Sequence, residues 1–370
     1  MISKEDGIIE KEFDTETVLM DKPFNPSEID ITIKPLTIDL LIKRLKANPP
    51  EIELSPEFQR AESLWTEKQQ SQLIESLLIK FPLPAFYFDG SNNNNWLIVD
   101  GLQRLSAIKN FTVLKTLRLT GLEFLSTLEG KGFDELDRSR QRDIEEAQIT
   151  AYVINPGTPE EVKFNIFKRL NTGGLVLTSQ EIRHALNHGV PAEFIAKLAN
   201  LKVFIDATGG IPTTRMLDRE FVTRFVAFYL SSISAYKPDI DTYMNEKMRA
   251  LKQISQTERD KIEHAFTASM ELAKEVFGKH AFRKAYDREE DRKPINKALF
   301  EVWSVSFAKL TDNERSILCN KKDVVFGGFV KLMNDDSEFV DSISSSTDQK
   351  KRVIVRYEKI KSLIKGVLAL

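Results

Sequence analysis

The chain has 370 residues, of which 41% are hydrophobic and 29% are charged. Its 53 basic and 55 acidic residues give a formal net charge of -2. The whole chain therefore has no basic field that would favour nucleic acid, and any such binding must come from a local patch. The length is typical of roughly two to three domains. The single cysteine, Cys319, excludes an internal disulfide framework and a cysteine-cluster zinc site.

The sequence contains no targeting or membrane signal that we can identify. Its start, MISKEDGIIEKEFD, lacks the continuous apolar core of a signal peptide. No apolar run approaches the ~18 residues that a membrane-spanning helix needs. We therefore expect a cytoplasmic protein.

Helices and strands alternate in the first half of the chain. Residues 1–30 are acidic and weakly patterned, and we expect them to form an N-terminal arm. A short helix should follow, then a Pro-Pro break and a strand near residues 51–54. Thr66 and Gln69 have the spacing of a capping box, which predicts the start of a helix that Pro82 and Pro84 end.

The next segments predict further strands and helices in the same half. AFYFDG and NWLIVDG are typical of two strands around a polar loop. A second capping box, Thr178 with Glu181, predicts another helix start. The other predictions here are a strand over 112–124, a charged helix over 132–144, a strand over 147–157 and a helix over 158–174.

After about residue 190 the strand signals fade and helical patterns dominate. The predicted helices lie within residues 219–232, 241–255, 258–278, 296–310 and 348–370. We expect an α+β fold: a mixed domain over 31–190, after the arm at 1–30, and an α-helical domain over 191–370.

The stretch from Asp100 to Arg104 supports two interpretations. As a structural element, Asp100 would be a helix N-cap and Gln103 would fill the capping-box position. That leaves Arg104 unexplained, because a cation is disfavoured beside the positive end of a helix dipole. As a binding site, free helix N–H groups together with Gln103 and Arg104 would cradle phosphate. Asp100 would then orient a metal ion or a water.

Two more turns carry a similar density of donors. SPEFQRAESLW contains Gln59 and Arg60, which could equally belong to an ordinary surface turn. FKRLNTGGLVLTSQEIRHAL could be a plain helix stop, yet its donors lie beside glycines that can form an anion-binding nest. These donors are Lys168, Arg169, Asn171 and Thr172, next to Gly173 and Gly174. Three such turns together predict a polyanionic ligand.

These three motifs, in this order and spacing, resemble the family called domain of unknown function 262. This is the ParB/sulfiredoxin-like N-terminal domain of GmrSD-type and SspE-type restriction proteins. RMLDREFVTRFVAFYL and FGKHAFRKAYDREEDRKPINKALFEVW are also similar to the helical region that follows in the family. The resemblance covers roughly residues 35–310.

The resemblance implies a domain that binds nucleoside triphosphates and, in several members, hydrolyses them. For hydrolysis we expect Arg104, Arg60 and Mg²⁺ to neutralise the γ-phosphate. Asp100, Gly101, Gln103 and Arg104 match the family motif Asp-Gly-Gln-Gln-Arg, while Leu102 replaces its first Gln. That departure favours binding over hydrolysis. Gln59 and Arg60 match a Gln-Arg pair that lies upstream in the family. Arg169, Asn171 and Gly173 match the family's Arg-x-Asn-x-Gly turn, which here contains Thr172.

Restriction members of the family also carry a C-terminal nuclease domain with a His- and Asn-containing metal finger. The last hundred residues contain only one histidine, His280, so we do not identify that domain here. Glu181, His184 and His188 share a helix face, but histidines at this spacing more often pack or lie on a surface, and we assign no metal.

Three functions remain open on the sequence. The chain is a nucleoside-triphosphate hydrolase of a restriction or anti-phage defence system, a non-hydrolysing switch that binds DNA or protein, or a structural protein whose turns only cap helices. Partners left open are DNA, a separate nuclease or other defence protein, and a second copy of the chain. If DNA binds, the candidates are Arg138, Arg140, Arg142, Lys350, Lys351 and Arg352, whose plainer interpretation is solvated helix faces.

Overall fold

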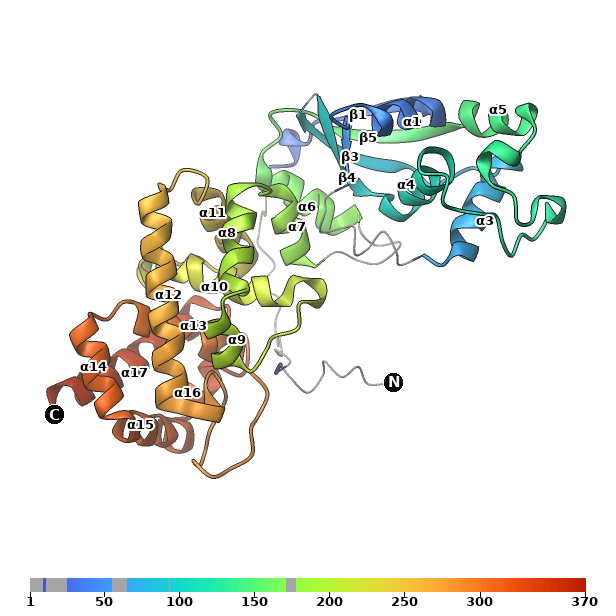
Figure 1. The fold of residues 1–370 in the computed structure, drawn as a ribbon. Coiled ribbons are helices and arrows are strands. Elements are labelled where there is room, and N and C mark those ends of the chain that lie inside the picture. Colours follow the sequence, from blue (N-terminus) through green and yellow to red (C-terminus); the bar gives the residue numbers. More distant parts are fainter. Residues whose placement is uncertain (1–8, 11–24, 55–64, 93, 171–177) are drawn as a thin grey trace. The chain divides into compact units, whose positions relative to one another are not determined.

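The computed structural model describes residues 9–10, 25–54, 65–92, 94–170 and 178–370. The chain divides into two compact units. One spans Lys22–Val176 and contains a five-stranded sheet with helices. The other spans Leu177–Leu370 together with Met1–Asp21, and its elements are helices. This confirms the predicted class, an α+β part followed by an α-helical part (Figure 1).

The sheet has the strand order β1-β5-β3-β4-β2. Its strands are β1 (Ile31–Thr37), β2 (Ile52–Glu53), β3 (Phe86–Asn92), β4 (Asn95–Asp100) and β5 (Gln148–Ile154). β1 pairs antiparallel with β5, β3 pairs parallel with β5 and antiparallel with β4, and β2 pairs parallel with β4. β1 was not expected, because Pro35 interrupts it; an edge strand tolerates a proline that a central strand would not.

Three helices cover one face of the sheet. Phe86, Phe88, Trp96 and Ile98 belong to an apolar core built with α1 (Ile38–Lys46), α3 (Glu67–Leu78) and α4 (Leu102–Ile108). α3 begins with the predicted capping box of Thr66 and Gln69.

The opposite face of the sheet is covered in part by α6 (Glu160–Leu170). Strand residues alternate between faces, so Asp89 lies on the face opposite Phe88. Lys163 of α6 forms an ion pair with Asp89 at 3.5 Å, and α6 packs against β4. The sheet therefore has helices on both faces.

The strand predicted over 112–124 is wrong. Lys109–Val113 forms a π-helical turn, η2, and the chain beyond it is irregular. Leu117 and Leu119 are buried in alternation, which produced the strand-like pattern. Leu119 exchanges backbone hydrogen bonds with residues 130–131 and not with the sheet. The short helices η1 (Pro26–Glu28), η3 (Ser126–Leu128) and η4 (Phe133–Glu135) and α5 (Arg138–Glu146) complete this unit; α5 is the predicted charged helix.

The five helices predicted after residue 190 are confirmed. They are α10 (Leu217–Tyr229), α11 (Ile240–Ala250), α12 (Gln256–Phe277), α13 (Lys297–Ala308) and α17 (Lys350–Ala369). The other elements of this unit are α7 (Ser179–Leu186), α8 (Val190–Ala199), α9 (Lys202–Thr208), η5 (Thr214–Met216), η6 (Ile233–Ala235), η7 (Gly278–His280), α14 (Asp312–Asn320), α15 (Lys322–Asp335) and α16 (Ser337–Ser342).

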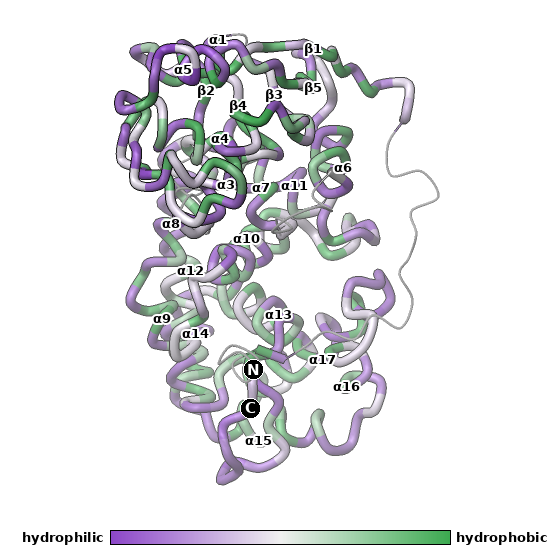
Figure 2. The backbone as a smooth tube through the Cα atoms, turned by 90° about the vertical axis from the view of Figure 1, so that its right-hand side faces the viewer, coloured by the Kyte–Doolittle hydropathy of each residue, from purple (hydrophilic) through white to green (hydrophobic). Residues whose placement is uncertain are grey.

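One continuous apolar core holds the helical unit together. α13 packs against α10, α12 and α17, and Phe225 of α10 contacts Phe266 of α12. Figure 2 shows hydrophobic and hydrophilic residues interspersed along the helices of this unit. α12 buries one side, whereas α10 and α13 are buried on almost all sides, as expected for helices at the centre of a core. Across the described part of the chain, no helix combines the length and the apolar character that crossing a membrane requires.

Candidate functional site

A bulge at the end of β4 re-aims Asp100. Phe88 pairs with Ile98, but the next pair is Tyr87 with Asp100, so Val99 is one extra residue in β4. Paired residues of antiparallel strands point to the same face. Asp100 therefore shares a face with Tyr87 and not with Ile98. Bulges often re-aim a side chain in this way beside active sites.

Gly101 makes the turn from this strand into α4. It has φ +100°, a conformation that L residues with side chains rarely adopt. A Cβ atom at this position would lie 2.6 Å from Cδ1 of Phe86. The position therefore requires glycine on two independent grounds, and the turn places the first residues of α4 directly after Asp100.

Arg104 is held by the end of β4 and by the segment that leads into β3. Its Nη2 lies 2.9 Å from Oδ2 of Asp100, one helical turn earlier. Nη1 donates to the carbonyl oxygens of Pro84 and Ala85, and the guanidinium lies over the Phe86 ring, 4.6 Å from its centroid. The Asp100 carboxylate explains how a cation is tolerated in the first turn of a helix.

Burial differs between the two members of this pair. The Arg104 side chain is only 12% exposed, whereas that of Asp100 is 31% exposed. Burial lowers the pKa of Arg104, and Asp100 opposes that shift. The pair is thus a partly accessible charged group at the end of the sheet, and Arg104 is not an ordinary surface residue.

The capping interpretation of this stretch is wrong in its details. Gly101, and not Asp100, occupies the N-cap position of α4, and no side chain caps the helix there. Oε1 of Gln103 accepts a hydrogen bond from the backbone N–H of Trp65 at 3.2 Å instead of returning to the cap. Leu102 packs against the apolar core, which accounts for an apolar residue where the family has Gln.

The predicted pair Gln59-Arg60 lies outside the described residues, but both flanking segments are described. β2 runs parallel to β4, with Glu53 opposite Leu97, so the chain leaves β2 in the direction of Asp100. At the other end, Trp65 is bound to Gln103. The predicted part of Gln59 and Arg60 in nucleotide binding stays a prediction.

The third motif is only partly described. Arg169 lies exposed in the last turn of α6. Asn171, Thr172 and Gly173 fall outside the described residues, so their predicted part in nucleotide binding stays a prediction. The capping box of Thr178 and Glu181 is confirmed at the start of α7.

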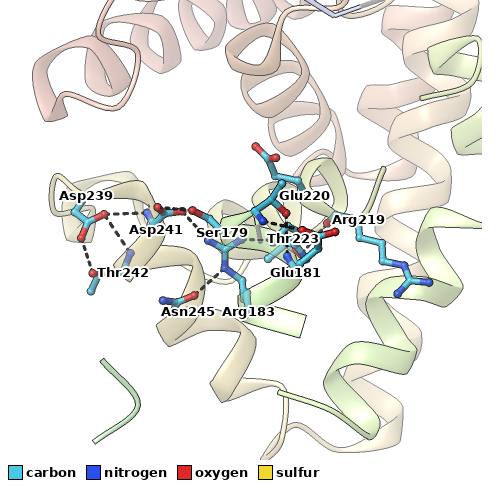
Figure 3. Close-up of polar contacts among 12 residues, drawn as sticks. Ser179, Glu181, Arg183, Arg219, Glu220, Thr223, Asp239, Asp241, Thr242 and Asn245 are labelled. Atoms are coloured by element: carbon cyan, nitrogen blue, oxygen red, sulfur yellow. Dashed lines mark hydrogen bonds and ion pairs between the residues drawn. The ribbon is translucent and has the colours of Figure 1, made fainter. Parts of the chain in front are cut away.

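A second polar cluster connects α7, α10 and α11 within the helical unit (Figure 3). Arg183 is buried and lies 2.9 Å from Oδ1 of Asp241 and 2.8 Å from Oδ1 of Asn245. Ser179 donates to the other oxygen of Asp241 at 2.9 Å, and Gln180 donates to Thr223 at 3.0 Å. These contacts fix three helices to one another.

His184 of α7 lies in a structural environment and is not part of a metal site formed by described residues. His184 is buried, which lowers its pKa to about 4, with a smaller contribution from His188. Glu181 pairs with Arg215 at 2.8 Å. Among the described residues, no group of three His, Cys, Asp or Glu side chains could hold a metal ion.

The basic residues considered for DNA pair largely with nearby partners. Arg138 lies 2.9 Å from Glu145, Arg140 lies 3.2 Å from Asp137, and Arg352 lies 3.6 Å from Asp341. Lys350 donates to a backbone carbonyl, while Arg142 and Lys351 are exposed. The contacts favour solvated helix faces over a concentrated phosphate-binding patch.

The site therefore consists of a charged pair and a glycine with positive φ at the end of a strand in an α+β domain. Residues 41–187 match the family model of the GmrSD restriction endonuclease, N-terminal domain. This part of the chain, which includes β4, Gly101 and α4, is similar to a domain of restriction endonucleases. Searches of curated proteins and of solved structures give no match.

Proposed function

We propose that this chain binds a nucleoside triphosphate at Asp100–Arg104 and hydrolyses it within a GmrSD-type restriction or anti-phage defence system. The observation that carries the proposal is the bulge at Val99, which aims Asp100 to the side of Tyr87 directly before the first turn of α4. The match over residues 41–187 supports the biological setting.

Each residue of the motif has a proposed role. Gly101 lets the backbone approach the phosphates closely, and the first N–H groups of α4 are oriented toward them. Arg104 shares its guanidinium between Asp100 and a phosphate oxygen. Gln59, Arg60, Arg169, Asn171, Thr172 and Gly173 would complete the phosphate contacts.

The accessible carboxylate of Asp100 also fits Mg²⁺, which is bound in such sites by one or two carboxylates and the substrate phosphates. The ion would neutralise charge on the transferred phosphoryl group. Asp100 and Gln103 would position the attacking water, and the hydrogen bond from Trp65 holds the Gln103 amide in place for this. DNA cleavage would come from a separate nuclease.

A second function has its own support in Leu102. This side chain packs into the apolar core, so it gives the site no polar group where the family has Gln. A protein that binds the nucleotide without hydrolysis, and that uses it as a switch for DNA or protein binding, is therefore the alternative.

Binding and phosphate release with ATP, GTP, CTP and UTP, each with Mg²⁺, separate these functions. Hydrolysis predicts phosphate release that Arg104→Ala abolishes. Arg118→Ala is the matched control, because Arg118 pairs with Glu135 on an exposed loop of the same unit. Binding without release would support the switch. Absence of both with all four nucleotides would refute the proposal.

A further inference from the structure

Two tyrosines lie beside the Asp100–Arg104 pair on the sheet face that Asp100 shares. Tyr87 is the strand partner of Asp100 and also of Tyr152 in β5. The two rings stack with centroids 4.8 Å apart and an interplanar angle of 11°. Both side chains are half-buried, and we refer to this pair as the tyrosine pair.

Tyr87 lies beside the proposed phosphate site, because Asp100 is its partner on the neighbouring strand. Burial raises the pKa of Tyr87, Tyr152 and Asp100 raise it further, and Arg104 lowers it. The Tyr87 hydroxyl therefore interacts electrostatically with both Asp100 and Arg104.

The surroundings of the tyrosine pair leave part of this face accessible. Asp89 follows Tyr87 by two residues in β3, so it lies on the same face, and it is buried together with Lys163 of α6. In the other direction, Ile33 of β1 pairs with Tyr152 in register and is 59% exposed. Thus α6 covers the face at Asp89, and the face becomes solvent-accessible from the tyrosines toward β1.

An aromatic surface beside a phosphate site has a specific chemical use. Nucleobases stack on aromatic side chains whatever their sequence, because every base has a π-face. Tyrosines that only stabilise the sheet as a cross-strand pair do not require a phosphate site as their neighbour. Here the strand partner of Tyr87 is the same Asp100 that the bulge re-aims.

We propose that the tyrosine pair is the nucleobase subsite of the nucleotide site: the base stacks on the ring face of Tyr152 that is turned away from Tyr87, while the phosphates lie at Asp100–Arg104. This inference rests on the proposed nucleotide binding and extends it. Stacking supplies affinity with modest preference among bases, so several nucleotides should bind.

The test compares nucleotides with inorganic tripolyphosphate, which has the phosphates but no base. Binding is measured by calorimetry, with Mg²⁺, on the full chain and on Tyr152→Ala, Tyr152→Leu and Tyr152→Phe. Tyr286→Ala is the matched control, because Tyr286 is an exposed tyrosine of the helical unit. Tyr152→Leu removes the aromatic ring but keeps a large side chain beside Tyr87, so it replaces Tyr152→Ala in the comparison if the alanine variant is unstable.

We expect Tyr152→Ala and Tyr152→Leu to weaken nucleotide binding by about tenfold and to leave tripolyphosphate binding unchanged. Tyr152→Phe should bind nucleotides as the wild type does. Equal losses for nucleotide and tripolyphosphate, or no loss in folded Tyr152→Leu, would overturn the inference.

Two further outcomes separate this inference from the proposed function. If the wild type binds tripolyphosphate as tightly as every nucleotide, the base subsite is refuted while the phosphate site stands. If it binds neither, the proposed function fails and the base subsite fails with it. Binding of single-stranded DNA without binding of mononucleotides would also refute the base subsite.

Discussion

The two units of this chain use buried and half-buried charge in different ways. In the helical unit, Glu301 of α13 is fully buried and contacts Arg224 at 3.0 Å and Arg356 at 2.7 Å. Arg356 also donates to the carbonyl oxygens of Ser342 and Thr347. In the α+β unit, the Asp100–Arg104 pair lies at the end of a strand with its carboxylate partly exposed.

The difference shows which charges are available for chemistry. Buried ions are costly to desolvate and persist only when hydrogen bonds satisfy them, so the Arg224–Glu301–Arg356 cluster is structural. The Asp100–Arg104 pair lies beside a bulge and a glycine with positive φ, and its carboxylate is partly accessible. A bulge that aims a partly exposed carboxylate away from the core is not required for packing, and bulges of this kind are often found beside active sites.

The largest effect is expected from Glu301→Ala. It leaves two arginines buried without their counter-ion, and removing one partner of a buried ion cluster costs roughly 3–5 kcal/mol. Denaturant unfolding measures this loss. Glu275→Ala is the control, because Glu275 pairs with Lys322 on the surface, and its effect should be small. A change for Glu301→Ala as small as the control's would show that the cluster contributes no stability.

A smaller effect on stability is expected when the pH is lowered, because the pKa of His184 in the helical unit differs between the folded and unfolded states. Its pKa falls from 6.5 to about 4 on folding, so below pH 6.5 the unfolded state binds a proton that the folded state does not. Stability is therefore lost as pH falls from 6.5 toward 4, by roughly 2 kcal/mol between pH 7.5 and 5.

The free energy of unfolding should differ less between pH 7.5 and pH 5 in His184→Gln than in the wild type. His264 is exposed, so His264→Gln should behave like the wild type. An unchanged pH dependence in His184→Gln would contradict the assignment to His184.

A smaller loss of stability is expected from Gly101→Ala, on the order of 1–2 kcal/mol, from its positive φ and its contact with Phe86. Gly130→Ala is the matched control, since Gly130 also has positive φ but no heavy atom would lie within 4 Å of its Cβ. Unlike changes in the helical unit, Gly101→Ala should also weaken nucleotide binding. Equal thermal shifts for the two glycine variants would show that the Phe86 contact is unimportant.

The sequence predicted most helices correctly because their signals are local. Capping boxes such as Thr66 with Gln69, and apolar stretches of helical length such as those of α10 and α13, depend only on neighbouring residues. The strand β1 was missed and the strand over 112–124 was wrongly predicted. Both errors depend on strand pairing with distant residues, which no local pattern encodes.

The residues proposed for the candidate site come from the sequence, whereas their geometry comes from the structure. The motif around Asp100 and Arg104 can be identified from residue types alone. The bulge at Val99 cannot, because Val99 sits inside an apolar run that predicts a regular strand. Phe86 under Arg104, and Tyr152 beside Tyr87, come together only through sheet pairing over a long sequence separation.

Thermal unfolding of the wild type and Arg104→Ala, with ATP, GTP, CTP and UTP and with and without Mg²⁺, tests the central claim most directly. A ligand that binds only the folded state raises the melting temperature, by about 5 °C or more at a concentration one hundred times its Kd. Each variant is compared with its own unliganded form, because Arg104→Ala removes buried hydrogen bonds and should melt earlier. We predict a shift for the wild type that Arg104→Ala loses; no shift with any nucleotide would contradict the account and leave Asp100–Arg104 as a structural ion pair.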